Sequence, residues 1–178
     1  PSRLLGTLRS AGAIYGGLMA GILGVVWYVR RKDLPLWQTL DTMAPFSALG
    51  VGLGRLGCLM AGCCYGTPYA GPLALVFPDH PQCRAEPGVS LFPIQPLSML
   101  NGIVLCGFLV FLLRRKRFEG QVVLAYLFLY SLTRGLLEFL RGDAERGTYL
   151  GNAVSTSQLI AIAGLIVSIA VVMQYMAS

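Results

Sequence analysis

Apolar runs long enough to cross a bilayer constrain this chain more than any other feature of its sequence. They cover residues 11–29, 40–60, 95–113, 121–140 and 155–176. About 20 apolar residues in a helix cross the ~30 Å of bilayer hydrocarbon. Only 12% of the residues are charged, about half the share in a soluble domain. We therefore predict an all-α, polytopic helical membrane protein, with about five transmembrane helices in one transmembrane domain over residues 1–178.

Two basic clusters set the predicted orientation. Arg30–Lys32 and Arg114–Arg117 each directly follow an apolar run, which places both clusters on the cytoplasmic side. The proline-rich loop over residues 67–94 is then an extracytoplasmic cap, and the C-terminus is cytoplasmic. The net charge is +6, but the basic residues are not interleaved with aromatic ones, so we expect no nucleic-acid partner. The chain starts with proline, and we expect an N-terminal part to be missing.

The helix predicted over residues 121–140 has three ionisable residues on one face. At about 100° per residue, Tyr130, Arg134, Glu138 and Arg141 fall within an arc of about 80°. An ionisable residue at the bilayer centre costs about 2.5–3.5 kcal/mol, so this face must meet protein, water or a charged ligand. Glu138 follows Arg134 by four residues and precedes Arg141 by three. It can therefore neutralise one of the two arginines.

The predicted topology places further polar residues in the same, outer half of the membrane. Tyr15 lies near the outer side of the first span, and Arg55 lies within the glycine-rich second span. Three arginines then face one glutamate, and in a low dielectric this surplus of charge needs an anion. A guanidinium binds phosphate through two parallel hydrogen bonds. We predict a lipid phosphate at Arg55 and Arg134, whereas a purely structural salt bridge stays open for Arg141.

The five cysteines are Cys58, Cys63, Cys64, Cys83 and Cys106. The first three cluster at the outer end of the second span. Their C-x4-C-C spacing, with His80 distant, is not the paired spacing of a zinc site, so we predict neither a metal nor a cofactor. The outer compartment is oxidising, which leaves open a disulfide, including one to Cys83. A thiol relay, in which Cys58 or Cys63 accepts a lipid first, is a further alternative.

Four sequence blocks occur in an order and spacing similar to those of a known family. They read GAIYGGLMAG, GRLGCLMAGCCYG, YSLTRGLLEFLR and VSTSQ. Along essentially its whole length the chain resembles bacterial prolipoprotein diacylglyceryl transferase, a multi-span inner-membrane enzyme whose members are longer at the N-terminus. The resemblance implies transfer of the diacylglyceryl group of phosphatidylglycerol to the thiol of the lipobox cysteine in a prolipoprotein. Glycerol phosphate is released.

The resemblance also assigns roles to individual residues. Arg55 matches the family's phospholipid-binding arginine, and Arg134 matches its second essential arginine. The remaining matched positions are Tyr130, Glu138, Arg141 and Gly66. We therefore predict that the catalytic residues are Arg55, Arg134, Tyr15 and Glu138. The predicted phosphatidylglycerol site is Arg55, Arg134, Tyr130, Arg141 and Gly66.

The chain departs from the family pattern where a base is expected. Tyr15 replaces a histidine, Cys58 replaces an asparagine and Cys63 replaces an acid, while Phe92 replaces the histidine of a His-Pro-x-Gln block. Tyr15 is a poor base because its reference pKa is near 10, although its hydroxyl can orient substrate. Two other routes stay open. The field of the arginines can ionise the acceptor thiol, or Glu138 can take its proton.

These departures leave two other functions open. One is a non-catalytic paralogue that binds anionic lipid or a lipoprotein precursor. The other is a thiol-redox membrane protein built on Cys58, Cys63 and Cys64. The expected partners are phosphatidylglycerol, a prolipoprotein and membrane lipid. The expected location is the bacterial cytoplasmic (inner) membrane, with several spans and the active site toward the extracytoplasmic side.

Overall fold

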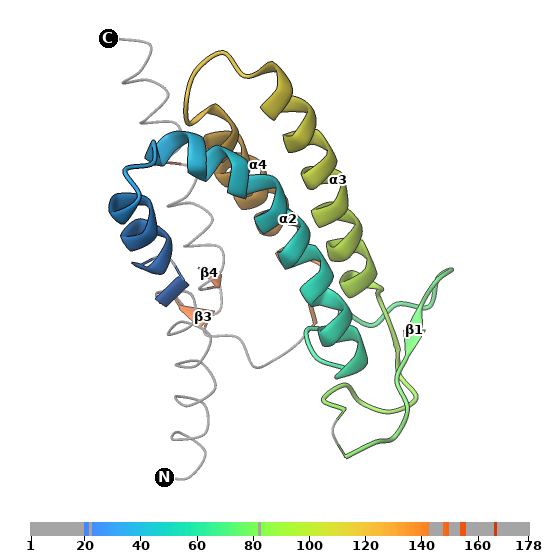
Figure 1. Cartoon of the computed structure of the whole chain (residues 1–178). Helices are drawn as coiled ribbons and strands as arrows, with labels where there is room; N and C mark the ends of the chain where they lie inside the picture. Colours follow the sequence, from blue (N-terminus) through green and yellow to red (C-terminus); the bar gives the residue numbers. More distant parts are fainter. Residues whose placement is uncertain are drawn as a thin grey trace. The chain divides into compact units, whose positions relative to one another are not determined.

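The computed structural model describes residues 20–21, 23–81, 83–142, 148–149, 154–155 and 166 (Figure 1). Tyr15 and nearly all of the span predicted over 155–176 therefore lie outside the described residues. The chain divides into two compact units, Pro1–Leu40 and Asp41–Ser178. In the first unit, residues 23–31 are helical. Arg31 stacks on the Trp27 ring at 5.3 Å from its centroid.

Three helices make up most of the described chain: α2 (Leu36–Met60), α3 (Ile94–Arg115) and α4 (Gln121–Glu138). Within the described residues, α2 and α3 are long and apolar enough to cross a membrane. They overlap the spans predicted over 40–60 and 95–113. Helix α4 overlaps the run over 121–140, and its crossing of a membrane stays a prediction, as does the total of five spans.

Two antiparallel strand pairs complete the described structure. They are β1 (Leu75–Val76) with β2 (Ser90–Leu91), and β3 (Thr148–Tyr149) with β4 (Val154–Ser155). The first pair lies within the proline-rich loop over residues 67–94. Phe77, Ala85 and Leu91 form a small buried cluster there. The described part of this loop therefore has its own small apolar core.

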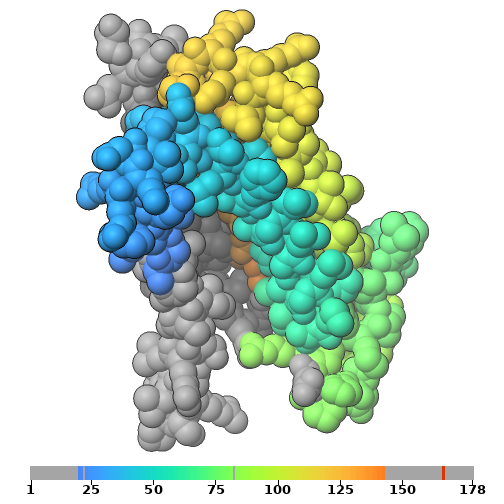
Figure 2. Space-filling view, viewed as in Figure 1, coloured from blue at the N-terminus to red at the C-terminus, as the bar shows by residue number. Residues whose placement is uncertain are grey.

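Glycines allow α2 and α3 to approach each other closely. A Cβ atom on Gly102 would lie 2.6 Å from the Cα of Gly52, and one on Gly52 would lie 3.1 Å from the Cα of Gly102. Figure 2 shows the two helices packed along each other on one face. Small residues let helices pack in lipid through backbone contact. Part of the glycine density in α2 therefore serves helix packing.

Helices α2, α3 and α4 share an apolar core, and a polar contact joins α3 to α4. The fully or nearly buried core residues are Ala44, Ala48, Leu105, Leu109 and Val122. Asn101 of α3 donates its side-chain amide to Thr133 Oγ1 of α4 at 3.1 Å. Thr133 in turn donates to the Leu129 carbonyl at 2.9 Å. An interhelical hydrogen bond of this kind fixes how far one helix can slide along the other.

The buried carboxylate of Asp41 joins the start of α2 to the start of α4. Its side chain is fully buried. Oδ2 accepts the Gly120 N–H at 2.9 Å, and Oδ1 accepts those of Val122 and Val123 at 3.0 Å each. The first N–H groups of a helix have no partner within the helix. The side chain of Asp41, about 80 positions earlier in the chain, accepts these hydrogen bonds. Its negative charge also interacts favourably with the positive end of the α4 helix dipole.

Lys116 balances the charge of Asp41. Its Nζ lies 3.1 Å from Asp41 Oδ2 and 2.6 Å from Glu119 Oε2. The hydrogen bond to Glu119, and secondarily that to Asp41, raises the pKa of Lys116 above its ordinary value of 10.5. The ammonium therefore stays charged through the whole physiological range. The α3–α4 turn is thus tied to α2 by an ion pair as well as by backbone donors.

The outward surface of the helices is apolar. Phe46 of α2, Val104 of α3 and Leu136 of α4 are 66%, 60% and 59% exposed, whereas Glu138 on the same helix as Leu136 is 3% exposed. A soluble protein rarely exposes so many large apolar side chains together. The burial of Glu138 agrees with the predicted polar face of α4, and the exposed apolar side chains indicate a lipid-facing exterior.

Replacing Asp41 with alanine should strongly destabilise the second unit. The change removes one of the two carboxylate partners of Lys116 and leaves the N–H groups of Gly120, Val122 and Val123 without their acceptor. Removing one partner of a buried charge pair costs about 3–5 kcal/mol in the free energy of unfolding. Thermal unfolding of detergent-solubilised protein, followed by circular dichroism, would measure the loss. Asp79→Ala, which removes an exposed carboxylate, is the matched control. Equal midpoints for the two variants would contradict the anchoring role.

Candidate functional site

Arg134, Glu138 and Arg141 form a buried charge cluster at the C-terminal end of α4. Arg134 Nη1 lies 3.1 Å from Glu138 Oε2, and Arg141 Nη1 lies 3.7 Å from the same oxygen. The side chains of the two arginines are 18% and 11% exposed. The spacing of one helical turn predicted this pairing, and the structure shows it. One carboxylate is therefore shared by two guanidinium groups, which leaves a net positive charge.

The segment after α2 pairs with the end of α4 through backbone hydrogen bonds. Thr67 N–H donates to the Leu140 carbonyl at 3.1 Å, and Gly142 N–H donates to the Tyr65 carbonyl at 3.0 Å. These bonds flank an antiparallel bridge between Gly66 and Arg141. The structure thus places Gly66 beside Arg141, two residues that the sequence predicted for one site.

Gly66 cannot be replaced without moving the backbone around it. A Cβ atom at this position would overlap the Phe92 carbonyl oxygen and lie 2.7 Å from the Phe92 Cβ. Phe92 also donates its N–H to the Thr67 carbonyl at 2.9 Å. The glycine therefore lets the segment fit between the end of α4 and the start of α3.

Arg55 lies in the wall of an apolar cavity between α2 and α3. The cavity has a volume of about 240 Å³. It is lined by Arg55, Leu56, Leu59, Gln95, Pro96, Met99, Leu100 and Ile103. No acidic side chain of the described residues forms an ion pair with Arg55. The cavity surface is almost entirely apolar although Arg55 is one of its lining residues, so the cavity itself suits a hydrocarbon chain.

Gln95 is the polar residue of this cavity that sequence reasoning did not assign to the site. It is 1% exposed, and its Nε2 donates to the Cys63 carbonyl at 3.1 Å. Within the described part of the chain, its Oε1 is buried and has no hydrogen-bond partner. An unpaired buried acceptor is costly unless a ligand, water or another group pairs with it. The only available signal was its place in the block Phe92–Gln95.

The charges of the cluster act on one another across the helices. Both Arg55 and Arg141 repel Arg134 electrostatically, and Glu138 attracts it. Arg134 and Arg141 share Glu138, and Arg55 of α2 adds a third positive charge that acts on Arg134. Tyr130 lies on the same helix, with its ring centroid 5.6 Å from that of Tyr126. The arrangement can attract and hold an anion such as a phosphate.

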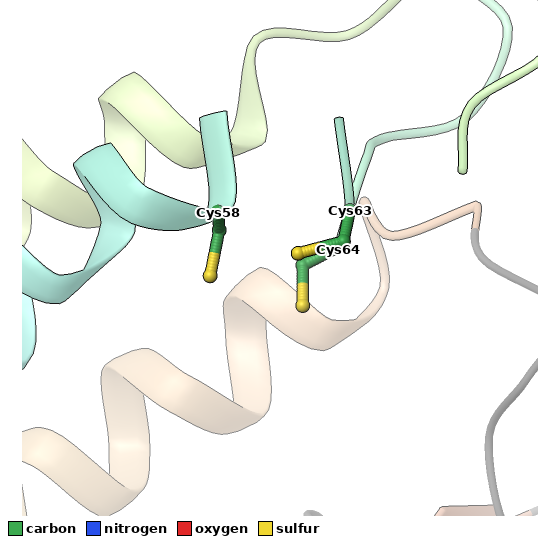
Figure 3. Close-up of side chains that lie close together, drawn as sticks. All are labelled: Cys58, Cys63 and Cys64. Carbon is green, nitrogen blue, oxygen red and sulfur yellow. The ribbon is translucent and has the colours of Figure 1, made fainter. Parts of the chain in front are cut away.

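Three thiols meet where α2 ends. The sulfur atoms of Cys58, Cys63 and Cys64 all lie within 4.8 Å of one another, and Figure 3 shows the side chains gathered around one space. All five cysteines are free thiols in this structure. Cys83 is separate from the three and packs beside Gly62. The C-x4-C-C spacing thus brings the three sulfurs together, which the sequence alone did not establish.

Burial gives Cys63 a weakly acidic thiol. Loss of solvent around it, with Cys58 and Cys64 beside it, raises its pKa from 9.0 to about 12. The thiolate is the reactive form of cysteine. Cys63 in its present surroundings is therefore a poor nucleophile at neutral pH, which weighs against a relay through this thiol.

The alkylation of Cys63 should show this raised pKa directly. We expect its rate with iodoacetamide to keep rising about tenfold per pH unit from pH 8 to 11, because the thiolate fraction grows over that whole range. Peptide mass spectrometry of the quenched protein would give the rate at each pH. In denatured protein the alkylation rate of the same cysteine should level off near its ordinary pKa of 9.0. Levelling near pH 9 in the folded protein would contradict the prediction.

Comparisons of the sequence with known proteins identify the family of this chain. A family model described as prolipoprotein diacylglyceryl transferase matches residues 3–174. The phosphatidylglycerol–prolipoprotein diacylglyceryl transferase of Clostridium tetani is 35% identical over 166 residues, which cover 93% of this chain and 65% of the relative. Transferase 2 of Clostridium perfringens is 33% identical over 162 residues, covering 91% and 61%.

A third relative, from Dehalococcoides mccartyi, has the same printed name and is 34% identical over 128 residues, which cover 72% of this chain and 49% of the relative. The chain thus spans less than two thirds of the length of these relatives. The family match nevertheless extends along nearly the whole chain and includes both arginine-bearing helices. This chain belongs to the prolipoprotein diacylglyceryl transferase family.

Proposed function

We propose that this chain forms the lipid-binding and transfer part of a phosphatidylglycerol–prolipoprotein diacylglyceryl transferase. It moves the diacylglyceryl group of phosphatidylglycerol to the lipobox cysteine thiol of a prolipoprotein. The printed names of the relatives from Clostridium tetani and Clostridium perfringens support this activity. The chain needs no cofactor for this reaction.

The observation that supports the proposal most is the surplus of buried positive charge beside an apolar cavity. Arg134 and Arg141 share Glu138, and Arg55 lines the cavity without an acidic partner among the described residues. Three arginines against one glutamate leave a surplus of two positive charges, and the single negative charge of a phosphodiester would offset one of them. Guanidinium groups suit a phosphodiester because they bind its oxygens in pairs.

The cavity offers a place for the hydrocarbon of the same lipid. Leu59, Leu100 and Ile103 are among its apolar walls. We infer that Arg55 binds the phosphate while part of an acyl chain follows the α2–α3 groove. Each buried CH₂ group contributes about 0.8 kcal/mol of binding free energy. The acyl chain would therefore set the depth of the lipid, and the arginines would hold its headgroup.

The reaction is a displacement at carbon. The acceptor thiolate attacks the glycerol carbon that bears the phosphate ester, a C–S bond forms and the C–O bond breaks. Glycerol phosphate leaves with the electron pair of that bond. Arg55 and Arg134 stabilise the charge that develops on the leaving group, and such preorganised donors act strongly in a dry site.

The acceptor thiol must lose its proton, and we propose that the arginine field assists this step. A nearby cation lowers the pKa of a cysteine. Glu138 already binds two arginines, which makes it a weak base. Tyr15, which lies outside the described residues, is proposed to orient substrate through its hydroxyl, and Tyr130, Arg141 and Gly66 complete the lipid site.

The proposed setting is the bacterial inner membrane. The chain would contribute about five spans, with the arginines in the outer half, the cap over residues 67–94 outside and the C-terminus in the cytoplasm. The apolar exteriors of α2, α3 and α4 support placement in lipid. The basic residues 114–117 after α3 support the orientation.

A transfer assay tests the proposal. Full-length protein in vesicles would receive phosphatidylglycerol and a lipobox peptide, and release of glycerol phosphate would be followed over time. Arg55→Ala and Arg134→Ala should each lower the transfer rate by about 100- to 1000-fold, the usual loss for one donor to a developing anion. Arg114→Ala, which removes an exposed arginine at the end of α3, should keep the wild-type rate.

Two results would change the assignment. A folded wild type that binds phosphatidylglycerol through Arg55 and Arg134, but releases no product, would replace the transferase with a lipid-binding paralogue. Loss of function in Cys63→Ser or Cys64→Ser with both arginine variants fully active would favour a thiol-redox protein. Either result would refute the proposed reaction.

A further inference from the structure

The thiols of Cys58, Cys63 and Cys64 form a cluster that the proposed reaction does not use. Their sulfur atoms lie within 4.8 Å of one another, and all three side chains are partly buried. Cys58 projects from the last turns of α2, and Cys63 and Cys64 project from the turn that follows (Figure 3). Three convergent thiols from two positions in the chain are an arrangement of potential metal ligands.

The backbone of the turn is shaped so that the thiols meet. Cys63 N–H donates to the Cys58 carbonyl at 3.0 Å, which closes the chain reversal. Gly62 and Cys64 have φ angles of +57° and +55°. A left-handed conformation is uncommon for a residue other than glycine, and such strain concentrates at functional sites. From α3, the buried Gln95 amide holds the Cys63 carbonyl at 3.1 Å.

We propose that Cys58, Cys63 and Cys64 bind one thiophilic metal ion, Cu(I) or Zn(II), through three thiolates. Binding releases three thiol protons to solvent and involves no redox change. Sulfur atoms about 2.3 Å from a shared ion lie about 3.8–4.0 Å apart. The observed limit of 4.8 Å requires the thiols to approach by about 1 Å at most, which rotation of the side chains supplies.

The ligand set favours Cu(I) over Zn(II). Among the described residues, no histidine or carboxylate joins the three cysteines, whereas structural zinc is held by four protein ligands. Three soft thiolates complete the coordination of Cu(I). Zinc would need water as a fourth ligand. The sequence spacing argues against a zinc site with four protein ligands. The three thiols of the folded cluster suit an ion that binds three ligands.

The ion would join the end of α2 to the segment that pairs with α4. Cys64 precedes Gly66 by two residues, and Gly66 bridges to Arg141. Cys58 follows Arg55 by three residues on the same helix. These arginines bring positive charge close to a thiolate site with a net negative charge. The metal site is thus continuous with the lipid site but uses different side chains.

Metal titration of the full-length protein in detergent, reduced and kept free of oxygen, tests this site. Wild type should bind one Cu(I) in competition with bicinchoninate. Cys58→Ser, Cys63→Ser and Cys64→Ser should each weaken binding by about 100-fold or more, because each change removes a direct ligand. Cys106→Ser, the matched control in α3, should bind as wild type does. X-ray absorption should show sulfur neighbours at about 2.3 Å.

The proposal fails if the triple serine variant binds Cu(I) and Zn(II) as tightly as wild type, or if the bound ion has only nitrogen and oxygen neighbours. It also fails if peptide mapping shows a disulfide among the three cysteines under these conditions. Equal metal-free thermal midpoints would show that the variants fold. Arg55→Ala should lower transfer by about 100- to 1000-fold and keep Cu(I) binding, so failure of the transferase proposal and failure of the metal site give different results.

Discussion

The carboxylate of Asp41 is the interaction on which the arrangement of the three described helices most depends. It is fully buried and receives three backbone N–H groups from the start of α4, together with the Lys116 ammonium. One side chain therefore sets where α4 begins relative to α2. The distance from that anchor to Arg134 and Glu138 is then fixed by the rise of a regular helix. A site at one end of the bundle thus takes its position from a charge buried at the other.

In the arginine cluster, a surplus of positive charge in a low dielectric favours the binding of an anion. In water, a third guanidinium beside an ion pair would be solvated at little cost. Between apolar helices, it is stable only with a counter-ion, and the cavity beside Arg55 admits one attached to hydrocarbon. An anionic phospholipid satisfies both conditions, whereas a free anion satisfies only the first. The lipid ligand that we propose therefore depends on the apolar walls as much as on the charges.

Short-range features of this fold could be predicted from the sequence, and long-range ones could not. The apolar runs indicated helices where α2, α3 and α4 occur, and the four-residue spacing indicated the Arg134–Glu138 pair. The pairing of Asp41 with Gly120, or of Gln95 with Cys63, joins residues far apart in the chain without a local pattern. The thiol cluster depends on a left-handed Cys64, a backbone state that no periodicity signals. The roles of Tyr15 and of the last predicted span stay predictions.

The bridge between Gly66 and Arg141 joins the segment after α2 to the end of α4 through backbone hydrogen bonds. Backbone hydrogen bonds do not depend on which side chains the residues carry. The exception is Gly66, where a side chain would overlap Phe92. Side chains around the bridge can therefore differ while the geometry of the bridge persists. The resemblance leads us to expect an asparagine at Cys58 and an acid at Cys63, and both positions precede this bridge in the chain. The metal chemistry proposed for their thiols therefore does not require the backbone of the bridge to change.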